Sequence, residues 1–332
     1  MESQPIGVVH FGLGPIGLAV AALVAERPWL RSVAAFDVSA ELQGRSLAEL
    51  TGRDAAGSPA VSGAYQGVPG ARIALHCTGS SLERVAPQIV ELVSSGLHVI
   101  STTEELSRPW EAHPGAAAAI AEAATRAGVT VLGTGINPGF AMDYLPIVLS
   151  AVVQRVDRVD VHRVQDAGTR HLPLQRKAAG MEADAFRTAV AEGHLGHVGL
   201  AESARMLAAA FGWRLSRLDE RIEPVCAEAP TPTSWGVVRP GQVLGLHQTA
   251  VGWAGGEVVV SLTLDMAIGL APARDHVRLS GVPNLELDVP GGLHGDLATA
   301  AIVVNAIPRV LAAAPGLATM VDLPPPTPGP PR

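Results

Sequence analysis

A glycine-rich turn between two apolar segments constrains the fold of this chain more than any other feature. The turn reads Gly12-Leu13-Gly14-Pro15-Ile16-Gly17. Residues 6–11 before it have the length of a buried parallel strand, and residues 18–25 after it have the composition of a helix. Gly12 permits the tight turn, Gly14 lets the backbone approach phosphate oxygens, and Gly17 lets the helix pack closely. The pattern predicts a strand, turn and helix whose N-terminus faces an anionic ligand.

An acidic residue follows the next predicted strand at the spacing that dinucleotide-binding folds use. That strand covers residues 32–36 and ends at Asp37, twenty residues past Gly17. A carboxylate there accepts hydrogen bonds from a ribose and repels a 2′-phosphate, so NAD is favoured, while Arg45 leaves NADP open. Pro15 suits the first helical turn because it lacks an N–H. We assign this part of the cofactor site to Gly12, Gly14, Pro15, Ile16, Gly17 and Asp37.

Charge and composition exclude several classes of protein. The 332 residues suffice for two domains with separate cores. A formal charge of −7 without a long basic run argues against a nucleic-acid partner. No basic segment followed by an apolar stretch opens the chain, and no run approaches the roughly 20 apolar residues of a membrane span, so we expect no membrane partner. Cys77 and Cys226 are the two cysteines, which suits a reducing, cytoplasmic compartment and no metal centre.

The first 135 residues alternate apolar strands with Ala-rich helical stretches, as in a doubly wound α/β sheet. Further strands are predicted at residues 73–77, 97–101 and 129–132. Ligands of open parallel sheets bind beyond the carboxyl ends of the strands. The loops after these strands are therefore candidate walls of the cofactor site, and we add Thr78, Gly79, Ser80 and Thr102 to it.

The pattern changes after residue 139 to that of an α+β domain with a mostly antiparallel sheet. A strand over residues 155–166 places Val159, Val161, Arg163 and Gln165 on one face, with Asp160 and His162 on the other. Helices are predicted at 182–192 and 200–211, a hairpin at 242–252 with 257–269, and strands at 276–280 and 284–289. An apolar helix over 295–313 returns to the first domain.

These elements give four parts. We predict a dinucleotide-binding domain at residues 1–136, a substrate and dimerisation domain at 137–292, a C-terminal segment at 293–323 and an extended, mobile Pro-rich tail at 324–332.

Four separated motifs resemble one known family. They cover residues 133–143, 172–177, 196–203 and 294–308. Together they look like the 2,4-diaminopentanoate dehydrogenase family, which is related to dihydrodipicolinate reductase and includes native amine dehydrogenases. The resemblance implies NAD(P)-dependent oxidative deamination of an amine, reversible as reductive amination of a carbonyl compound with ammonia. From these motifs we add Asn137, Pro138 and Asn305 to the cofactor site.

Deprotonation of an amine before hydride loss requires a base. Residues 101–107 match the Ser-Thr-x-Glu-Glu-Leu-Ser stretch of native amine dehydrogenases, in which a glutamate is the catalytic carboxylate. We assign Glu104 and Glu105 as catalytic candidates and favour Glu104, which follows its strand more closely. Repulsion between the two carboxylates favours a raised pKa for one of them. The alternative is a solvated acidic loop, with Glu105 as its first candidate.

Substrate contacts have competing structural explanations. Phe140 and Tyr144 are candidates for an apolar wall or for the core. Arg163 either binds a substrate carboxylate or forms an internal ion pair, with Asp166 or Asp184 as partner. His197 and His247 are candidates for a polar wall or for structural hydrogen bonds. The predicted substrate-binding set is Phe140, Tyr144, Arg163, Gln175, His197 and Met266.

The expected partners are a small amine or carbonyl substrate, ammonia and a second copy of the chain, because the second domain's sheet has a face that needs covering. Two other functions remain open. One is reduction of a C=N or C=C bond in a cyclic substrate, as in dihydrodipicolinate reductase. The other is a dinucleotide-binding sensor without turnover.

Overall fold

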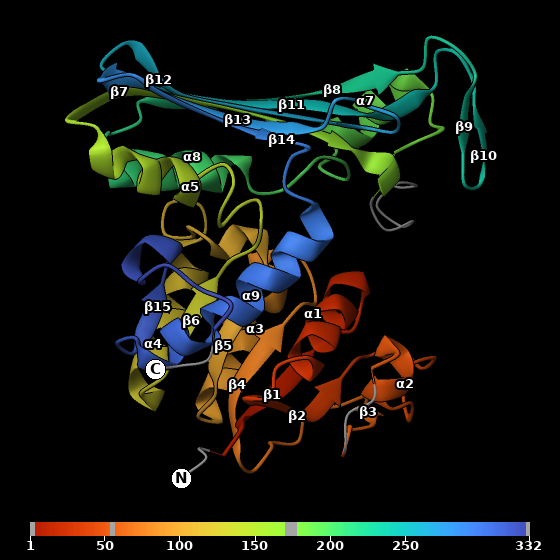
Figure 1. The fold of residues 1–332 in the computed structure, drawn as a ribbon, viewed down its shortest axis with the longest axis vertical. Helices are drawn as coiled ribbons and strands as arrows, with labels where there is room; N and C mark the ends of the chain where they lie inside the picture. Colours follow the sequence, from red (N-terminus) through yellow and green to blue (C-terminus); the bar gives the residue numbers. More distant parts are fainter. Residues whose placement is uncertain (1–3, 54–56, 170–177, 330–332) are drawn as a thin grey trace. The chain divides into compact units, whose positions relative to one another are not determined.

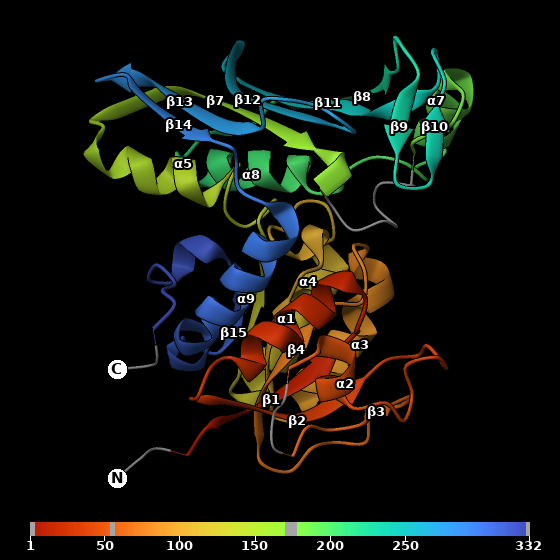
Figure 2. The same ribbon diagram turned by 45° about the vertical axis from the view of Figure 1, so that its right-hand side comes forward.

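The computed structural model describes residues 4–53, 57–169 and 178–329, and its chain forms two compact units. Unit 1 comprises Met1–Gly139 and Asp296–Arg332, and unit 2 comprises Phe140–Gly295 (Figures 1 and 2). The sequence places the corresponding boundaries after residues 136 and 292.

Unit 1 is built on a seven-stranded sheet in which all paired strands are parallel. The strand order is β15-β6-β5-β4-β1-β2-β3, so the order reverses direction at β1, between β2 and β4. The strands are β1 Ile6–Phe11, β2 Leu30–Phe36, β3 Val61–Ser62, β4 Ala71–His76, β5 His98–Ser101, β6 Thr130–Gly133 and β15 Gly316–Ala318. This order confirms the predicted doubly wound α/β fold. The edge strand β15 was not predicted, because three residues carry too little pattern.

Helices cover both faces of this sheet. α1 (Pro15–Ala25) and α2 (Leu47–Thr51) pack on one face, in a core that includes Leu13, Ala35 and Val61. α3 (Leu82–Ser94) and α4 (Pro114–Ala127) pack on the other, in a larger core built on Val9, Ala74, Val99 and Val131. Figures 1 and 2 show α9 (Gly295–Ala312) on the α1 face. Short 3-10 helices occur at η1 (Glu104–Leu106) and η4 (Met320–Asp322).

Among the residues described, α9 is one helix with the length and apolar composition of a membrane span. The expectation that no segment approaches such a length is therefore wrong. Half of the helix is buried inside the protein, and Val303, Val304 and Ile307 are completely covered. Its apolar character is that of a helix packed in a core, as predicted for a segment that is apolar nearly all round.

Unit 2 is built on a six-stranded sheet with the order β14-β13-β7-β12-β11-β8. The pair β12 and β7 is parallel and the other pairs are antiparallel, in agreement with the predicted mostly antiparallel sheet. Its strands are β7 Arg155–Asp166, β8 Arg217–Cys226, β11 Val243–Ala254, β12 Glu257–Ala267, β13 Arg274–Val282 and β14 Leu285–Pro290. A separate hairpin pairs β9 (Thr231–Thr233) with β10 (Gly236–Val238). The edge strand β8 was not predicted, because five of its ten residues are charged.

The two faces of the unit 2 sheet differ in cover. α5 (Tyr144–Leu149) and α8 (Leu200–Ala210) lie on one face, as Figures 1 and 2 show. The alternation in β7 follows this arrangement: Val159, Val161, Arg163 and Gln165 are buried, while Asp160 and His162 are half-buried on the other face. No helix of the described chain covers that other face, which we call the open face. The remaining helices are η2 Ser150–Val152, η3 Ala167–Thr169 and α7 Ala183–Ala191.

Burial of histidine makes the stability of this fold depend on pH. His10 on β1 is 1% exposed and bonds Ser32 at 2.9 Å, and burial lowers its pKa to about 4. In the unfolded chain this histidine has its ordinary pKa of 6.5, so stability is complete above that pH and falls as the pH decreases toward 4. We predict that His10→Gln makes this fall shallower by about 1.4 kcal/mol per pH unit in urea titrations. His194→Gln, at a side chain that is 74% exposed, should leave it unchanged. Equal pH dependence in all three proteins would contradict the assignment.

Candidate active site

The glycine turn packs three backbone segments against one another. Gly12 has φ +90°, and a Cβ placed on it would lie 2.6 Å from the carbonyl oxygen of Cys77. A Cβ on Gly17 would lie 2.0 Å from the carbonyl oxygen of Gly12. Nothing lies within 4 Å of a Cβ placed on Gly14, and no described side chain caps the N-terminus of α1 at this residue. The N-terminus of α1 is therefore unobstructed at Gly14, which fits the approach of a phosphate group.

Asp37 is held beside this turn by two backbone amides. Its Oδ2 accepts from the N–H of Leu13 at 2.6 Å, and its Oδ1 accepts from the N–H of Ser39 at 2.8 Å. Arg45, the residue that leaves NADP open, forms an ion pair with Glu49 at 2.8 Å. The carboxylate is thus ordered at the end of β2, where a ribose hydroxyl binds in folds of this type.

The ends of five strands lie in one row of the unit 1 sheet. Phe11 pairs with both Phe36 and His76, and Ser101 pairs with both His76 and Gly133. The loops that follow these residues therefore start at the same level of the same edge. They contain the glycine turn, Asp37, the segment 78–80, Thr102 and the segment from Thr134 to Pro138. The structure thus brings most of the predicted cofactor residues to one edge.

Two further observations bear on the cofactor site. Thr134 Oγ1 and Asn305 Oδ1 are buried oxygens with no hydrogen-bond partner in the described chain, as expected of atoms that bind a ligand or water.

Cys77 lies under the glycine turn, and burial raises the pKa of its thiol to about 12. Cys77 therefore stays protonated and is no nucleophile.

Glu104 and Glu105 differ in their surroundings. Glu105 Oε2 accepts from the N–H of Leu82 at 2.6 Å, at the first residue of α3, and lies 3.3 Å from His113 Nε2. This carboxylate is engaged in stabilising the N-terminus of α3. Glu104 is half-buried in the first position of η1, and its carbonyl oxygen accepts from Ser107 Oγ at 2.8 Å. Glu105 therefore has a structural role at the start of α3, both glutamates are half-buried, and the assignment of either one as the reacting carboxylate stays a prediction.

Arg163 forms an internal ion pair. The residue is 2% exposed, and its Nη1 donates to Asp275 Oδ1 at 2.9 Å. Its Nη2 donates to the carbonyl oxygen of Leu293 at 2.6 Å, and the N–H of Leu293 donates to Asp275 Oδ2 at 2.7 Å. Burial raises the pKa of Asp275, and the guanidinium of Arg163 opposes that shift. The predicted alternative of an ion pair is therefore confirmed, and binding of a substrate carboxylate stays a prediction.

The partners proposed from sequence for Arg163 were wrong. Asp166 accepts from the N–H groups of Gly168 and Gly269, and Asp184 pairs with Arg187. The partner, Asp275, was missed, although it alternates with Val277 on the buried face of β13. An aspartate in an inward position of a strand was the available signal.

Other predicted substrate residues lie in unit 2. The rings of Phe140 and Tyr144 are 6.2 Å apart, Tyr144 is 5% exposed, and burial raises its pKa. His197 exchanges two backbone hydrogen bonds of 2.8 Å with the buried amide of Gln248, and Met266 is half-buried on β12. Gln248 was not predicted. Gln175 and the motif at 172–177 lie outside the described residues.

Comparison with known proteins identifies the family. The profile described as the 2,4-diaminopentanoate dehydrogenase C-terminal domain matches residues 140–328. The 2,4-diaminopentanoate dehydrogenase of Acetoanaerobium sticklandii is 34% identical over 269 residues, which cover 77% of this chain and 74% of that protein. This chain belongs to the 2,4-diaminopentanoate dehydrogenase family. The resemblance seen in the sequence motifs is thereby confirmed.

Solved structures share the fold of this family member. The amine dehydrogenase of Mycobacterium smegmatis superposes with a TM-score of 0.86 at 23% identity, over 98% of both chains. An engineered D-amino acid dehydrogenase bound to NADP+ superposes with a TM-score of 0.50 at 14% identity, over 97% of this chain and 95% of that one. At these identities the comparison establishes the fold.

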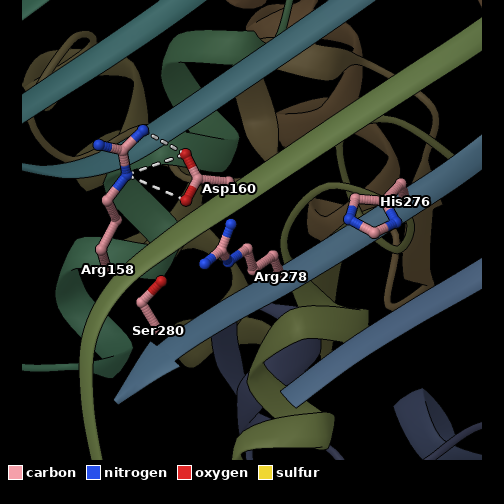
Figure 3. Close-up of a pocket in the computed structure, with 5 residues that line it drawn as sticks. All are labelled: Arg158, Asp160, His276, Arg278 and Ser280. Carbon is pink, nitrogen blue, oxygen red and sulfur yellow. Dashed lines mark hydrogen bonds and ion pairs between the residues drawn. The ribbon is translucent and has the colours of Figure 1, made fainter. Parts of the chain in front are cut away.

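The open face of unit 2 carries a separate hollow of about 440 Å³, which contains no predicted site residue. Figure 3 shows its five lining residues, Arg158, Asp160, His276, Arg278 and Ser280, on β7 and β13. Asp160 pairs with Arg158 inside the hollow, and Arg278 pairs with Glu286 at 3.4 Å. On the same face Asp265 bonds His162 and His247, so His247 has a structural partner. Over 4–53, 57–169 and 178–329 no group of three or more His, Cys, Asp or Glu side chains is arranged so that it could hold a metal ion.

Removing one partner of the buried pair Arg163–Asp275 should destabilise unit 2. Arg163→Leu leaves Asp275, 1% exposed, without its guanidinium, and we predict a loss of about 3–5 kcal/mol in denaturant unfolding. Adding Asp275→Asn should recover part of this loss, because the buried charge is gone while Leu293 keeps an acceptor. Arg155→Leu breaks an exposed pair with Asp157, which solvent screens, and should leave the free energy of unfolding nearly unchanged. Equal losses for Arg163→Leu and Arg155→Leu would rule this out.

Proposed function

We propose that this protein is an NAD-dependent dehydrogenase that acts on CH–NH2 donors. It converts an amine, a cationic coenzyme and water into a ketone or aldehyde, ammonium and reduced coenzyme, and the reverse reaction is reductive amination with ammonia. The observation that carries the proposal is the position of Glu104 in a member of this family. It is half-buried and follows β5, which ends in the same row of the sheet as the strand before the glycine turn.

The coenzyme would be held along the strand ends of unit 1. The first amides of α1 suit its pyrophosphate, and Asp37 suits the hydroxyls of its adenosine ribose. NAD is favoured over NADP because Asp37 is negatively charged and Arg45 is paired with Glu49. A coenzyme bound there would supply the acceptor for the hydride that leaves the carbon carrying the amine.

Glu104 would supply the proton chemistry. Its carboxylate takes a proton from the substrate ammonium, which frees the nitrogen lone pair to drive hydride loss. Hydride loss leaves an iminium, and the carboxyl group releases its first proton to solvent. As a carboxylate again, it takes a proton from the water that adds to the iminium carbon and passes it to the nitrogen, which leaves as ammonia and takes up the hydroxyl proton to become ammonium. Phe140, Tyr144, Met266 and His197 remain candidates for walls around the substrate, which we expect to be a short amine or a diamino acid.

The assignment of the base is tested with two isosteric variants. We predict that the protein reduces NAD in the presence of at least one short amine or diamino acid, measured at the absorbance band of reduced nicotinamide. Glu104→Gln should lower turnover by at least about 100-fold, because the amide accepts no proton. Glu105→Gln should retain most turnover, because its oxygen still accepts from Leu82. No reduction across the panel, or loss of turnover in Glu105→Gln alone, would refute the assignment.

We further propose a homodimer formed through the open face. Six strands of 6 to 12 residues, about 4.8 Å apart and rising about 3.3 Å per residue, give this face about 1,000 Å². A standard interface needs about 800 Å² per partner. Charges of both signs alternate across the face, as in the pairs Arg158–Asp160 and Arg278–Glu286, so it can pack against a copy of itself.

The dimer is tested by sedimentation velocity. We predict that Thr263→Glu, in the middle of the open face on β12, converts the dimer to a monomer at micromolar concentration, because it buries an unpaired charge. Thr188→Glu, an exposed position on α7, makes the same chemical change outside the face and should stay dimeric. A monomeric wild-type protein, or a dimeric Thr263→Glu, would exclude this interface.

A further inference from the structure

A chain of buried polar groups joins the loops after β4 and β5. His76 and Ser101 are the paired last residues of these strands, and both are completely buried. His76 Nδ1 lies 2.9 Å from Ser101 Oγ, which lies 2.9 Å from Thr103 Oγ1. Thr103 Oγ1 lies 2.8 Å from the carbonyl oxygen of Gly79. This series of hydrogen bonds thus runs from His76 to Gly79, in a loop predicted to contact the coenzyme.

The proton positions along this chain are fixed from its end. The carbonyl of Gly79 only accepts, so Thr103 Oγ1 must donate to it and accept from Ser101 Oγ. The hydroxyl of Ser101 therefore donates to Thr103 Oγ1, and the Ser101 oxygen accepts from the backbone N–H of Thr103 at 3.1 Å. The remaining contact of Ser101 then requires a proton on His76 Nδ1.

The other ring nitrogen agrees with a neutral imidazole. Burial lowers the pKa of His76 to about 4, so at neutral pH the ring carries one proton, and the chain places it on Nδ1. Nε2 is then an acceptor; Thr78 Oγ1 and Gln88 Oε1 each lie 2.9 Å from it, and Thr78 Oγ1 lies 2.9 Å from Gln88 Oε1. Because Nε2 and Oε1 would both be acceptors, this proton order requires the oxygen and nitrogen of the Gln88 amide to exchange places, so that its NH2 group donates to Nε2.

We propose that His76 is a positioning residue whose Nδ1–H, through Ser101, holds Thr103 and thereby the start of η1. Thr103 precedes Glu104 and occupies the N-cap position of η1, where its side chain makes no capping hydrogen bond. This line of hydrogen bonds ties Thr103, the residue before the proposed base, to the carbonyl oxygen of Gly79 in the proposed coenzyme loop. The expected effect on turnover rests on the proposed function, whereas the protonation of the His76 ring on Nδ1 does not depend on it.

The tautomer is tested without any assay of activity. Nitrogen-15 NMR of histidine-labelled protein, with the His76 signal assigned by its loss in His76→Asn, should show a neutral ring protonated on Nδ1 between pH 6 and 8. A neutral ring protonated on Nε2, or an imidazolium in this range, would overturn the proton order. This readout stands even if no amine is a substrate.

Two substitutions of His76 separate its nitrogens. The amide NH2 of asparagine occupies the place of Nδ1–H, whereas that of glutamine occupies the place of Nε2. We expect His76→Asn to keep kcat within about threefold and His76→Gln to lower it about tenfold, with little change in the Kd for NAD. Equal losses in both variants would show that the ring serves packing alone.

A matched pair of variants at Thr103 tests whether the hydrogen bonds affect turnover by positioning Glu104. Thr103→Val removes the hydroxyl at nearly constant shape and should lower kcat about tenfold, whereas Thr103→Ser keeps the hydroxyl and should recover most of it. In a Glu104→Gln background, Thr103→Val should have no further effect, because the group being positioned is gone. The same fall in both backgrounds would overturn the positioning role. A Glu104→Gln protein with normal turnover would instead refute the proposed function, and the NMR result would still decide the tautomer.

Discussion

The close approach of three backbones at the glycine turn is the constraint on which unit 1 depends. Gly17 contacts the carbonyl of Gly12, and Gly12 contacts the carbonyl of Cys77, at distances that no side chain permits. This contact joins β1, α1 and β4 at the point where the strand order reverses. The same packing leaves open space at Gly14, so the requirement for a tight turn and the capacity to receive a phosphate group have one origin.

A row of strand ends then concentrates chemistry at one edge. Parallel strands deliver all their following loops to that edge, so residues far apart in the chain act side by side. The two adjacent glutamates at this edge differ in their surroundings. Glu105 is bound by the N-terminus of α3, whereas Glu104 next to it is held at the start of η1. His76, buried beneath both loops, serves through the direction of its hydrogen bonds rather than through charge.

Unit 2 uses the two faces of one sheet differently. The covered face holds apolar residues and a buried ion pair between Arg163 and Asp275, which also fixes Leu293 shortly before the chain re-enters unit 1. The open face carries charged side chains of both signs and histidines, which pair with one another and are half-buried. A polar face of this size is compatible with water and with a second copy, which explains why it lacks the apolar character of a core.

The sequence alone determined the features that depend on local pattern. The glycine turn, Asp37, the alternation in β7 and the buried α9 all follow from residue type and spacing, which limit the backbone before any distant contact forms. The family followed from motifs at 133–143, 172–177, 196–203 and 294–308, because a specific order of short segments is rarely shared by chance. Strands of three residues and the charged edge strand β8 were missed, since they depend on neighbours rather than on their own pattern.

Only the tertiary structure decided which side chains are partners. Asp275 rather than Asp166 or Asp184 faces Arg163, because strand register and not sequence distance sets that contact. Glu105 rather than Glu104 meets the start of α3, and His76 meets Ser101 across two strands. Sequence spacing fixes the direction of a side chain within its own element, whereas packing between elements fixes what it reaches, and the chemistry of a site depends on both.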